Sequence, residues 1–136
     1  MSAMSDYLEV EIRKHIFRTG SFTKPTVLAV GLFTTNPTDA GGGTEVTGGS
    51  YARVQRDPLD ANWTGASSTD GLTDNAAALT FPGPSASWGV ITGFGIFDAT
   101  TTGNLLIWGA LSTPKTVNNG DPAPAFAIGA LDITFA

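Results

Sequence analysis

The stretch WGVITGFGIFD, residues 88–98, decides the fold class of this chain. Its residues alternate between two expected faces, and a period of two is typical of a β-strand. One face is expected to carry Trp88, Val90, Thr92, Phe94 and Ile96, and the other Gly89, Ile91, Gly93, Gly95 and Phe97. Glycines on one face allow another backbone or a large ring to come close. The stretch therefore predicts a strand with close packing on its glycine face.

Further strands are predicted on both sides of this stretch. The run TVLAVGLF at 26–33 is apolar on both expected faces, as in a strand buried on both sides. The run NLLIWGAL at 104–111 follows a hairpin-type loop at 100–103. Shorter strands are expected at 45–55, which Gly48 and Gly49 interrupt, at 76–81 and at 125–135. About seven strands at spacings of ~8–12 residues indicate an antiparallel β-sandwich, of jelly-roll or Ig-like type.

One helix is predicted at 5–18, ahead of the strands. Its apolar stripe recurs every four residues and consists of Met4, Leu8, Ile12 and Ile16. Ser5 or Asp6 can cap its start, and Gly20 can take the left-handed conformation after its end. The expected fold is therefore mainly β with one N-terminal α-helix.

Length and composition limit the class of protein. The 136 residues predict a single domain at 1–136, with the helix at 5–18 and the sandwich at 23–136. A hydrophobic fraction of 41% with only 14% charged residues excludes a disordered tail. The absence of cysteine excludes disulfides and zinc–thiolate sites. No apolar run approaches the ~18 residues that a membrane span needs, and residues 1–6 lack the apolar core of a signal peptide.

Charge is distributed unevenly along the chain. Residues 1–56 hold six basic and five acidic side chains, a net of +1, whereas residues 57–136 hold one and seven, a net of −6. The acidic part repels phosphates, so no nucleic-acid partner is expected. The candidate partner interface is the basic cluster around the helix, formed by Arg13, Lys14, Arg18 and Lys24 together with His15. These charges can equally serve only to solvate an exposed helix face.

No catalytic residue is predicted. The single histidine, His15, has carboxylates near it only on its own helix, so a packing or interface role is favoured over a catalytic base. The glycine run 41–43 is followed by Thr44 and Glu45 and lacks the lysine of a phosphate-binding loop. An enzymatic activity and a cofactor are therefore not expected.

Metal and sugar sites are weakly indicated. Asp57 with Asp60, or Asp70 with Asp74, could offer oxygen ligands to calcium, but aspartates are common in turns and no metal is expected. The aromatic residues that could stack on sugars are Trp63, Trp88 and Trp108. Packing is the favoured role of these tryptophans.

The order of short motifs is more informative than any single site. The helix carries SDYLE and HIFR, and the motifs that follow are VGLFTTNPTD at 30–39, GGGTEV at 41–46, GGSYAR at 48–53, LTFP at 79–82, WGVITGFGIFD at 88–98, GNLLIWGAL at 103–111 and KTVNNGD at 115–121. This order resembles a family of small virion proteins of tailed bacteriophages, often labelled tail-fibre or minor structural proteins. The resemblance implies a non-enzymatic virion protein made in the host bacterial cytoplasm. Its implied partners are the major capsid protein or tail proteins, with homo-oligomers in the assembly and no membrane.

The location in the virion can be narrowed by size. A tail fibre usually needs length from repeats or a coiled trimer, and neither is visible in this sequence. We therefore expect a capsid decoration or cement protein, which binds and stabilises the shell. The alternative is a tail-fibre, tail-tip or head-fibre module, with host-receptor or glycan binding as a further role.

Overall fold

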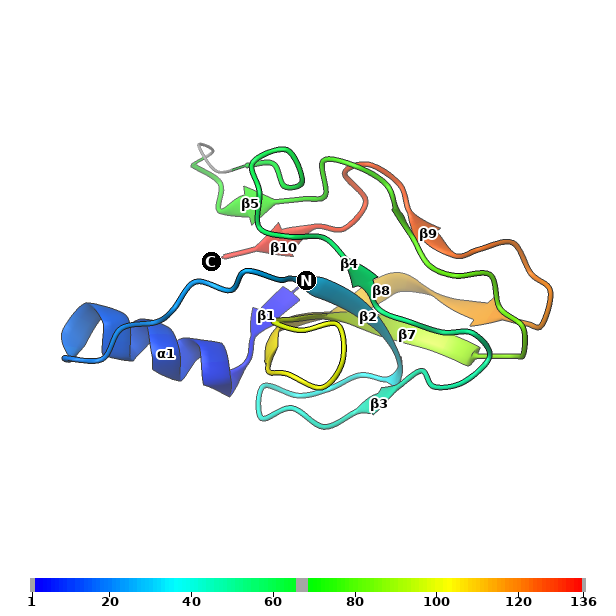
Figure 1. Cartoon of the computed structure of the whole chain (residues 1–136), viewed down its shortest axis with the longest axis horizontal. Coiled ribbons are helices and arrows are strands. Elements are labelled where there is room, and N and C mark those ends of the chain that lie inside the picture. Colours follow the sequence, from blue (N-terminus) through cyan, green and yellow to red (C-terminus); the bar gives the residue numbers. More distant parts are fainter. Residues whose placement is uncertain (1, 66–68, 136) are drawn as a thin grey trace.

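The computed structural model describes residues 2–65 and 69–135, and within them the main element is a six-stranded antiparallel sheet. Its strand order is β1-β8-β7-β2-β3, and β4 also pairs with β2. The sheet contains β1 (Ser2–Met4), β2 (Ala29–Thr35), β3 (Thr44–Glu45), β4 (Val54–Gln55), β7 (Gly89–Phe97) and β8 (Leu105–Val117), and the helix α1 (Asp6–Phe17) follows β1. Figure 1 shows α1 extending from one end of the sheet. The predicted domain limits Met1 and Ala136 lie outside the described residues.

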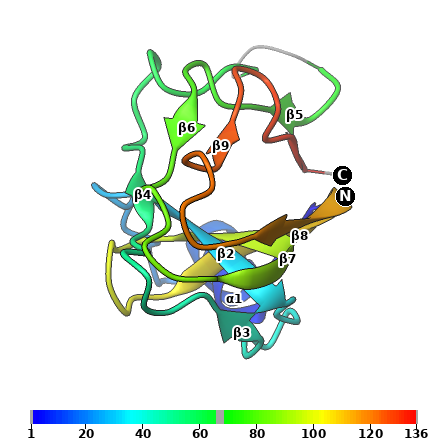
Figure 2. The ribbon, with the colours of Figure 1, turned by 90° about the vertical axis from the view of Figure 1, so that its right-hand side faces the viewer.

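A second layer covers one face of the sheet (Figure 2). It contains two short antiparallel ladders, β5 (Leu72–Thr73) with β10 (Ile133–Thr134) and β6 (Leu79–Thr80) with β9 (Ala125–Phe126). Buried side chains of the sheet, among them Val30, Phe94 and Ile96, share one apolar cluster with Leu79 and Leu131 of this layer. The core therefore lies between the sheet and the ladders.

The described residues confirm a mainly β, antiparallel fold with an N-terminal helix. They do not establish the jelly-roll or Ig-like sandwich, because the second layer has ladders of only two residues per strand. Prolines flank the β6–β9 ladder, with Pro82 and Pro84 after β6 and Pro122 and Pro124 before β9. Proline has no backbone N–H to donate to a ladder, so it ends strands in this layer.

The expected alternation of faces along β7 breaks at its start. Ile91 pairs with Lys115 but Gly93 pairs with Ala110, so extra residues of β8 bulge out between the two pairs. Ile91 is buried in the core, whereas Val90 is 47% exposed. The prediction that Val90 shares a face with Phe94 and Ile96, with Ile91 on the opposite face, is therefore wrong. Ile91 and Phe94 are three residues apart and both reach the core, so the alternation along β7 changes phase where its pairing with β8 is irregular.

The glycine face of the sheet behaves as predicted. Gly31 and Gly95 are direct partners in β2 and β7. The rings of Phe33 and Phe97 stack beside them, with centroids 6.1 Å apart. A Cβ atom at Gly95 would lie 2.8 Å from the Phe33 ring. The two glycines thus allow this ring pair to lie close to the backbone.

Helix α1 begins at a well-formed cap. Ser5 Oγ accepts a hydrogen bond from the Leu8 N–H at 3.2 Å and donates to the Leu105 carbonyl at 2.6 Å. The helix therefore starts at a fixed point on β8. Its end differs from the prediction, because Arg18 is extended and Gly20 is not among the left-handed glycines.

Replacing Ser5 by Ala is expected to lower the free energy of unfolding by about 1–2 kcal/mol, since it removes the cap of α1. Urea unfolding measures the change. Ser112, exposed on β8, offers a matched control, and Ser112→Ala should change stability by less than about 0.5 kcal/mol. Equal stability of the two variants would contradict a structural role for the cap.

Candidate partner interface

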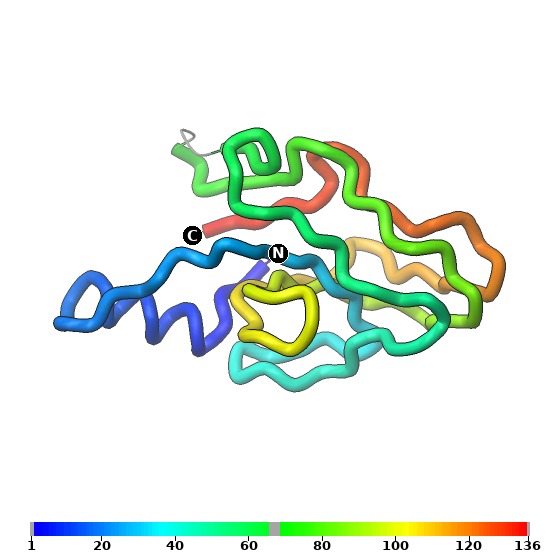
Figure 3. Tube along the Cα trace, in the orientation of Figure 1, coloured from blue at the N-terminus to red at the C-terminus, as the bar shows by residue number. Residues whose placement is uncertain are grey.

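The outer half of α1 is exposed, since residues 13–17 are all exposed. Along the predicted apolar stripe, Leu8 is buried and Ile12 is half-buried, but Ile16 is 62% exposed. Phe17, the last helical residue, is 77% exposed. Figure 3 shows the chain turning back after this end and running toward β2. The stripe is thus buried only where the helix lies against the sheet, and its last turn extends into solvent.

The predicted basic residues of α1 all lie on the surface. Lys14 Nζ forms an exposed ion pair with Glu11 at 2.8 Å, and Arg13 Nε donates to the Glu9 carbonyl at 3.4 Å. Arg18 has no ion-pair or hydrogen-bond partner for its side chain among the described residues. The backbone N–H of Arg18 donates to the Lys14 carbonyl at 3.1 Å, so Arg18 directly follows the last turn of the helix.

The two other predicted interface residues have local roles. His15 Nδ1 accepts a hydrogen bond from the Phe22 N–H at 3.2 Å, which holds the turn after the helix. Lys24 Nζ donates to the Pro58 carbonyl at 3.4 Å, at the other side of this connection. The structure therefore places Arg13 and Lys14 on the exposed outer half of α1 and Arg18 directly after it, whereas Lys24 contacts Pro58 on the connection to β2.

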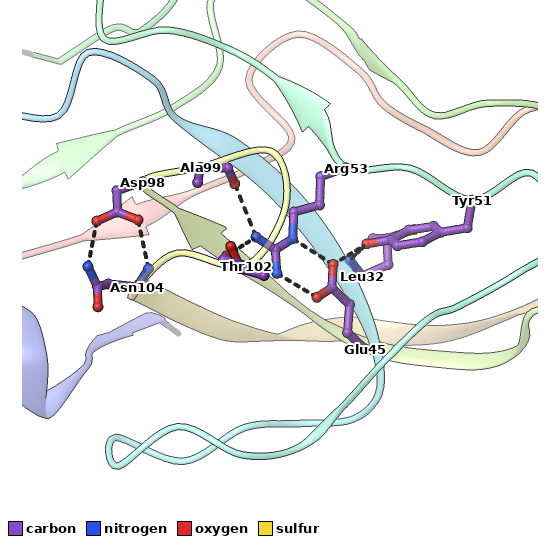
Figure 4. Close-up of polar contacts among 8 residues, drawn as sticks. All are labelled: Leu32, Glu45, Tyr51, Arg53, Asp98, Ala99, Thr102 and Asn104. Atoms are coloured by element: carbon purple, nitrogen blue, oxygen red, sulfur yellow. Dashed lines mark hydrogen bonds and ion pairs between the residues drawn. The ribbon is translucent and has the colours of Figure 1, made fainter.

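A polar cluster that the sequence did not predict lies on the glycine face of the sheet (Figure 4). The Arg53 guanidinium forms two bonds of 2.7 Å with the Glu45 carboxylate and lies 3.4 Å from the centre of the Phe97 ring. It also donates to the carbonyls of Ala99 and Thr102, at 3.0 and 2.7 Å. Arg53 therefore joins the edge of the sheet to the loop between β7 and β8.

Tyr51 extends the same cluster. Its hydroxyl donates to Glu45 at 2.9 Å and accepts from the Leu32 N–H at 2.8 Å. Both β3 and β4 pair with the outer edge of β2. Between these two pairings, the Tyr51 hydroxyl bonds the Leu32 N–H of that edge. Burial raises the pKa of this hydroxyl well above its ordinary value, so it stays protonated and remains a donor. The cluster is structural, because its polar groups are paired with one another.

The tryptophans fit the packing interpretation. The indole N–H groups of Trp63, Trp88 and Trp108 all donate to acceptors within the chain. Trp88 is buried and packs edge-on against Tyr51. These contacts give each tryptophan a role in the fold.

Two further features follow from the described residues. In 2–65 and 69–135, no group of three or more His, Cys, Asp or Glu side chains is placed to hold a metal ion. No helix in the same ranges is long and apolar enough to cross a membrane. The aspartates considered for calcium instead make local contacts, since Asp57 accepts from the Gln55 amide and Asp74 from the Thr64 hydroxyl.

Comparison with known proteins assigns the family. No curated protein matches the chain. The family described as Podophage GP4 fiber I protein gp80 matches residues 3–134, nearly the whole chain. The match confirms the predicted resemblance to phage virion structural proteins and a non-enzymatic, structural role in the virion. It favours a fibre over the capsid decoration or cement protein that the size of the chain suggested. The chain belongs to the Podophage GP4 fiber I protein gp80 family, and it is a phage fibre protein.

Proposed function

We propose that this fibre protein binds its neighbours in the virion through the exposed end of α1. The observation that carries the proposal is the pairing of exposed apolar and basic side chains there. Ile16 and Phe17 are 62% and 77% exposed, and Arg13, Lys14 and Arg18 surround them. Contiguous exposed apolar surface beside charge is typical of protein interfaces. A helix held firmly at Ser5 presents this end in a fixed direction.

The basic side chains at the end of α1 favour a partner with an acidic surface. Basic side chains at the rim of an interface raise the association rate and fix the orientation of the partner. Individual contacts of this kind are weak, and many equivalent copies in a particle add their strengths. The proposal applies equally to a tail-fibre, tail-tip or head-fibre module.

The size of the chain is compatible with a fibre. The expectation of a decoration protein assumed that one chain must supply the length of the fibre by itself. Several chains joined end to end provide the same length without repeats in the sequence. A compact fibre module of this kind would be a single domain over 1–136, which we propose from the shared core of sheet and ladders. A β-sandwich description, jelly-roll or Ig-like, stays a prediction.

Reversing the charge of the helix tests the interface. The combined substitution Arg13→Glu, Lys14→Glu and Arg18→Glu is expected to lower the amount of the protein in purified particles by at least about tenfold, because it replaces attraction by repulsion at the partner. Quantitative mass spectrometry of the particles, normalised to the most abundant virion protein, measures this occupancy.

Lys115→Glu is the control, since Lys115 is an exposed basic residue on β8, away from α1. It should leave occupancy unchanged. Circular dichroism of both purified variants checks that they fold. Full occupancy of the folded charge-reversed variant would reject α1 as the interface.

A further inference from the structure

The turn between β8 and β9 carries the one asparagine of the chain that is followed by glycine. The sequence contains six asparagines, and the residues that follow them are Pro37, Trp63, Ala76, Leu105, Asn119 and Gly120. Asparagine is thermolabile, because the backbone nitrogen of the next residue can attack its side-chain amide carbon. A following glycine hinders this attack least, since it has no Cβ atom. The sequence therefore distinguishes Asn119 from the other five asparagines by its neighbour Gly120.

The Asn119 side chain is free to react. Asn119 is exposed, and within the described part of the chain no hydrogen bond holds its amide. Four other asparagines are held by side-chain hydrogen bonds, and these are Asn36 with Thr92, Asn62 with Asp57, Asn75 with Ala77 and Ala127, and Asn104 with Asp98. Asn118 is exposed as well, but the Cβ atom of Asn119 hinders attack on it. Asn119 thus combines a free amide with the least hindered attacking neighbour.

The fold restrains the nitrogen that would attack. The Gly120 N–H donates to the Pro84 carbonyl at 3.0 Å, which ties the turn to the segment between β6 and β7. The turn is closed by two further bonds, since the Asp121 N–H donates to the Asn118 carbonyl at 3.2 Å and the Asp121 carboxylate accepts from the Asn118 N–H at 2.7 Å. Gly120 has a φ of 78°, which a turn of this kind favours in glycine. To attack, the Gly120 nitrogen must lose its proton and leave the Pro84 carbonyl, so the native fold opposes the reaction that the sequence favours.

We propose that Asn119 is a site of spontaneous deamidation and that the hydrogen bond between Gly120 and Pro84 controls its rate. The Gly120 nitrogen forms a bond to Cγ of Asn119, and the bond from Cγ to Nδ2 breaks. Ammonia leaves with the proton that the Gly120 nitrogen has lost, and a five-membered cyclic imide remains. Water then opens the imide at Cγ to give aspartate, or at the main-chain carbonyl to give isoaspartate.

The reaction changes the turn in two ways. Both products add one negative charge next to the exposed end of β8, and isoaspartate also adds one carbon atom to the main chain. The imide nitrogen carries no proton, so the bond to Pro84 is absent while the ring persists. The contact between Gly120 and Pro84 therefore protects a chemically labile turn for as long as the native fold is intact.

Storage of the purified chain in mildly alkaline buffer tests the site. Ion-exchange chromatography should show the slow appearance of an acidic species that elutes close to Asn119→Asp, and tandem mass spectrometry should locate the modification at Asn119. Asn119→Gln should not form this species, because a glutamine side chain has to close a larger ring. Asn118 is the internal control, since it is exposed and adjacent, and it should stay unmodified over the same time.

Unfolding the chain tests the control of the rate. Concentrated urea is expected to raise the rate at Asn119 by about tenfold or more, because a tenfold change corresponds to about 1.4 kcal/mol of activation free energy, the size of one good hydrogen bond. Asp121→Ala removes one closure of the turn and should raise the rate in the folded chain by about threefold or more. Asp132→Ala removes an exposed carboxylate from another segment and should leave the rate unchanged.

Two results would overturn the proposal. An unfolded chain that is modified first at an asparagine other than Asn119 would reject Asn119 as the site. Equal rates at Asn119 in the folded and the unfolded chain would reject the contact with Pro84 as the control of the rate. Circular dichroism checks that the chain and its variants are folded in buffer, and the urea comparison decides the second point even where Asp121→Ala does not fold.

Discussion

Glu45→Ala is expected to lower the free energy of unfolding by about 2–3 kcal/mol, because it removes one partner of a partly buried ion pair, and a fully buried pair would lose about 3–5 kcal/mol. The Arg53 side chain is only 9% exposed and bonds both oxygens of Glu45. Without the carboxylate, its positive charge stays buried above the Phe97 ring. Tyr51 also loses the acceptor of its hydroxyl. Urea unfolding followed by tryptophan fluorescence measures the effect.

Two further variants test whether the unpaired charge of Arg53 causes this loss of stability. Glu11→Ala breaks the exposed pair with Lys14 and should cost less than about 1 kcal/mol, because solvent screens that pair. Glu45→Ala combined with Arg53→Leu should be more stable than Glu45→Ala alone, because it no longer buries an unpaired charge. Equal losses for Glu45→Ala and Glu11→Ala would contradict the structural role of the cluster.

Local patterns predicted the elements with the strongest periodicity. The helix predicted at 5–18 is α1 at Asp6–Phe17 with Ser5 as its cap, since apolar spacing and capping are properties of neighbouring residues. The strand predicted at 88–98 is β7 at Gly89–Phe97 for the same reason. The predicted role of glycine on one face of that strand is also confirmed by the stacked rings of Phe33 and Phe97.

Features that depend on pairing between distant segments were not predictable. The change of register opposite Ile91 arises from the path of β8, which the alternation in β7 does not contain. The motifs GGGTEV at 41–46 and GGSYAR at 48–53 held both Glu45 and Arg53, but nothing in their spacing indicated an ion pair over Phe97. Short ladders in the second layer also depend on contacts made far along the chain.

The exposure of residues in the candidate interface could be predicted only in part. Basic residues of the helix are exposed, and so is Ile16 of the predicted apolar stripe. Periodicity indicates which side of a helix is apolar and does not say where the surface beneath it ends. In this fold the helix extends beyond the sheet, and the exposed Phe17 becomes the most informative residue of the interface.

Asn75→Ala is expected to cost about 3–5 kcal/mol, because it leaves three backbone groups without partners. Asn75 is completely buried. Its amide donates to the carbonyls of Ala77 and Ala127, at 2.9 and 2.8 Å, and its side-chain oxygen accepts from the Leu131 N–H at 2.9 Å. The Asn75 side chain thus replaces the backbone hydrogen bonds of a β-ladder between two segments that have little regular structure. Urea unfolding measures the loss.

Asn119, exposed in a turn, is the control, and Asn119→Ala should change stability by less than about 0.5 kcal/mol. Asn75 also fixes the segment that leads into β10, since it accepts the hydrogen bond from the Leu131 N–H. Equal stability of the Asn75 and Asn119 variants would show that the buried amide contributes nothing to the stability of the second layer.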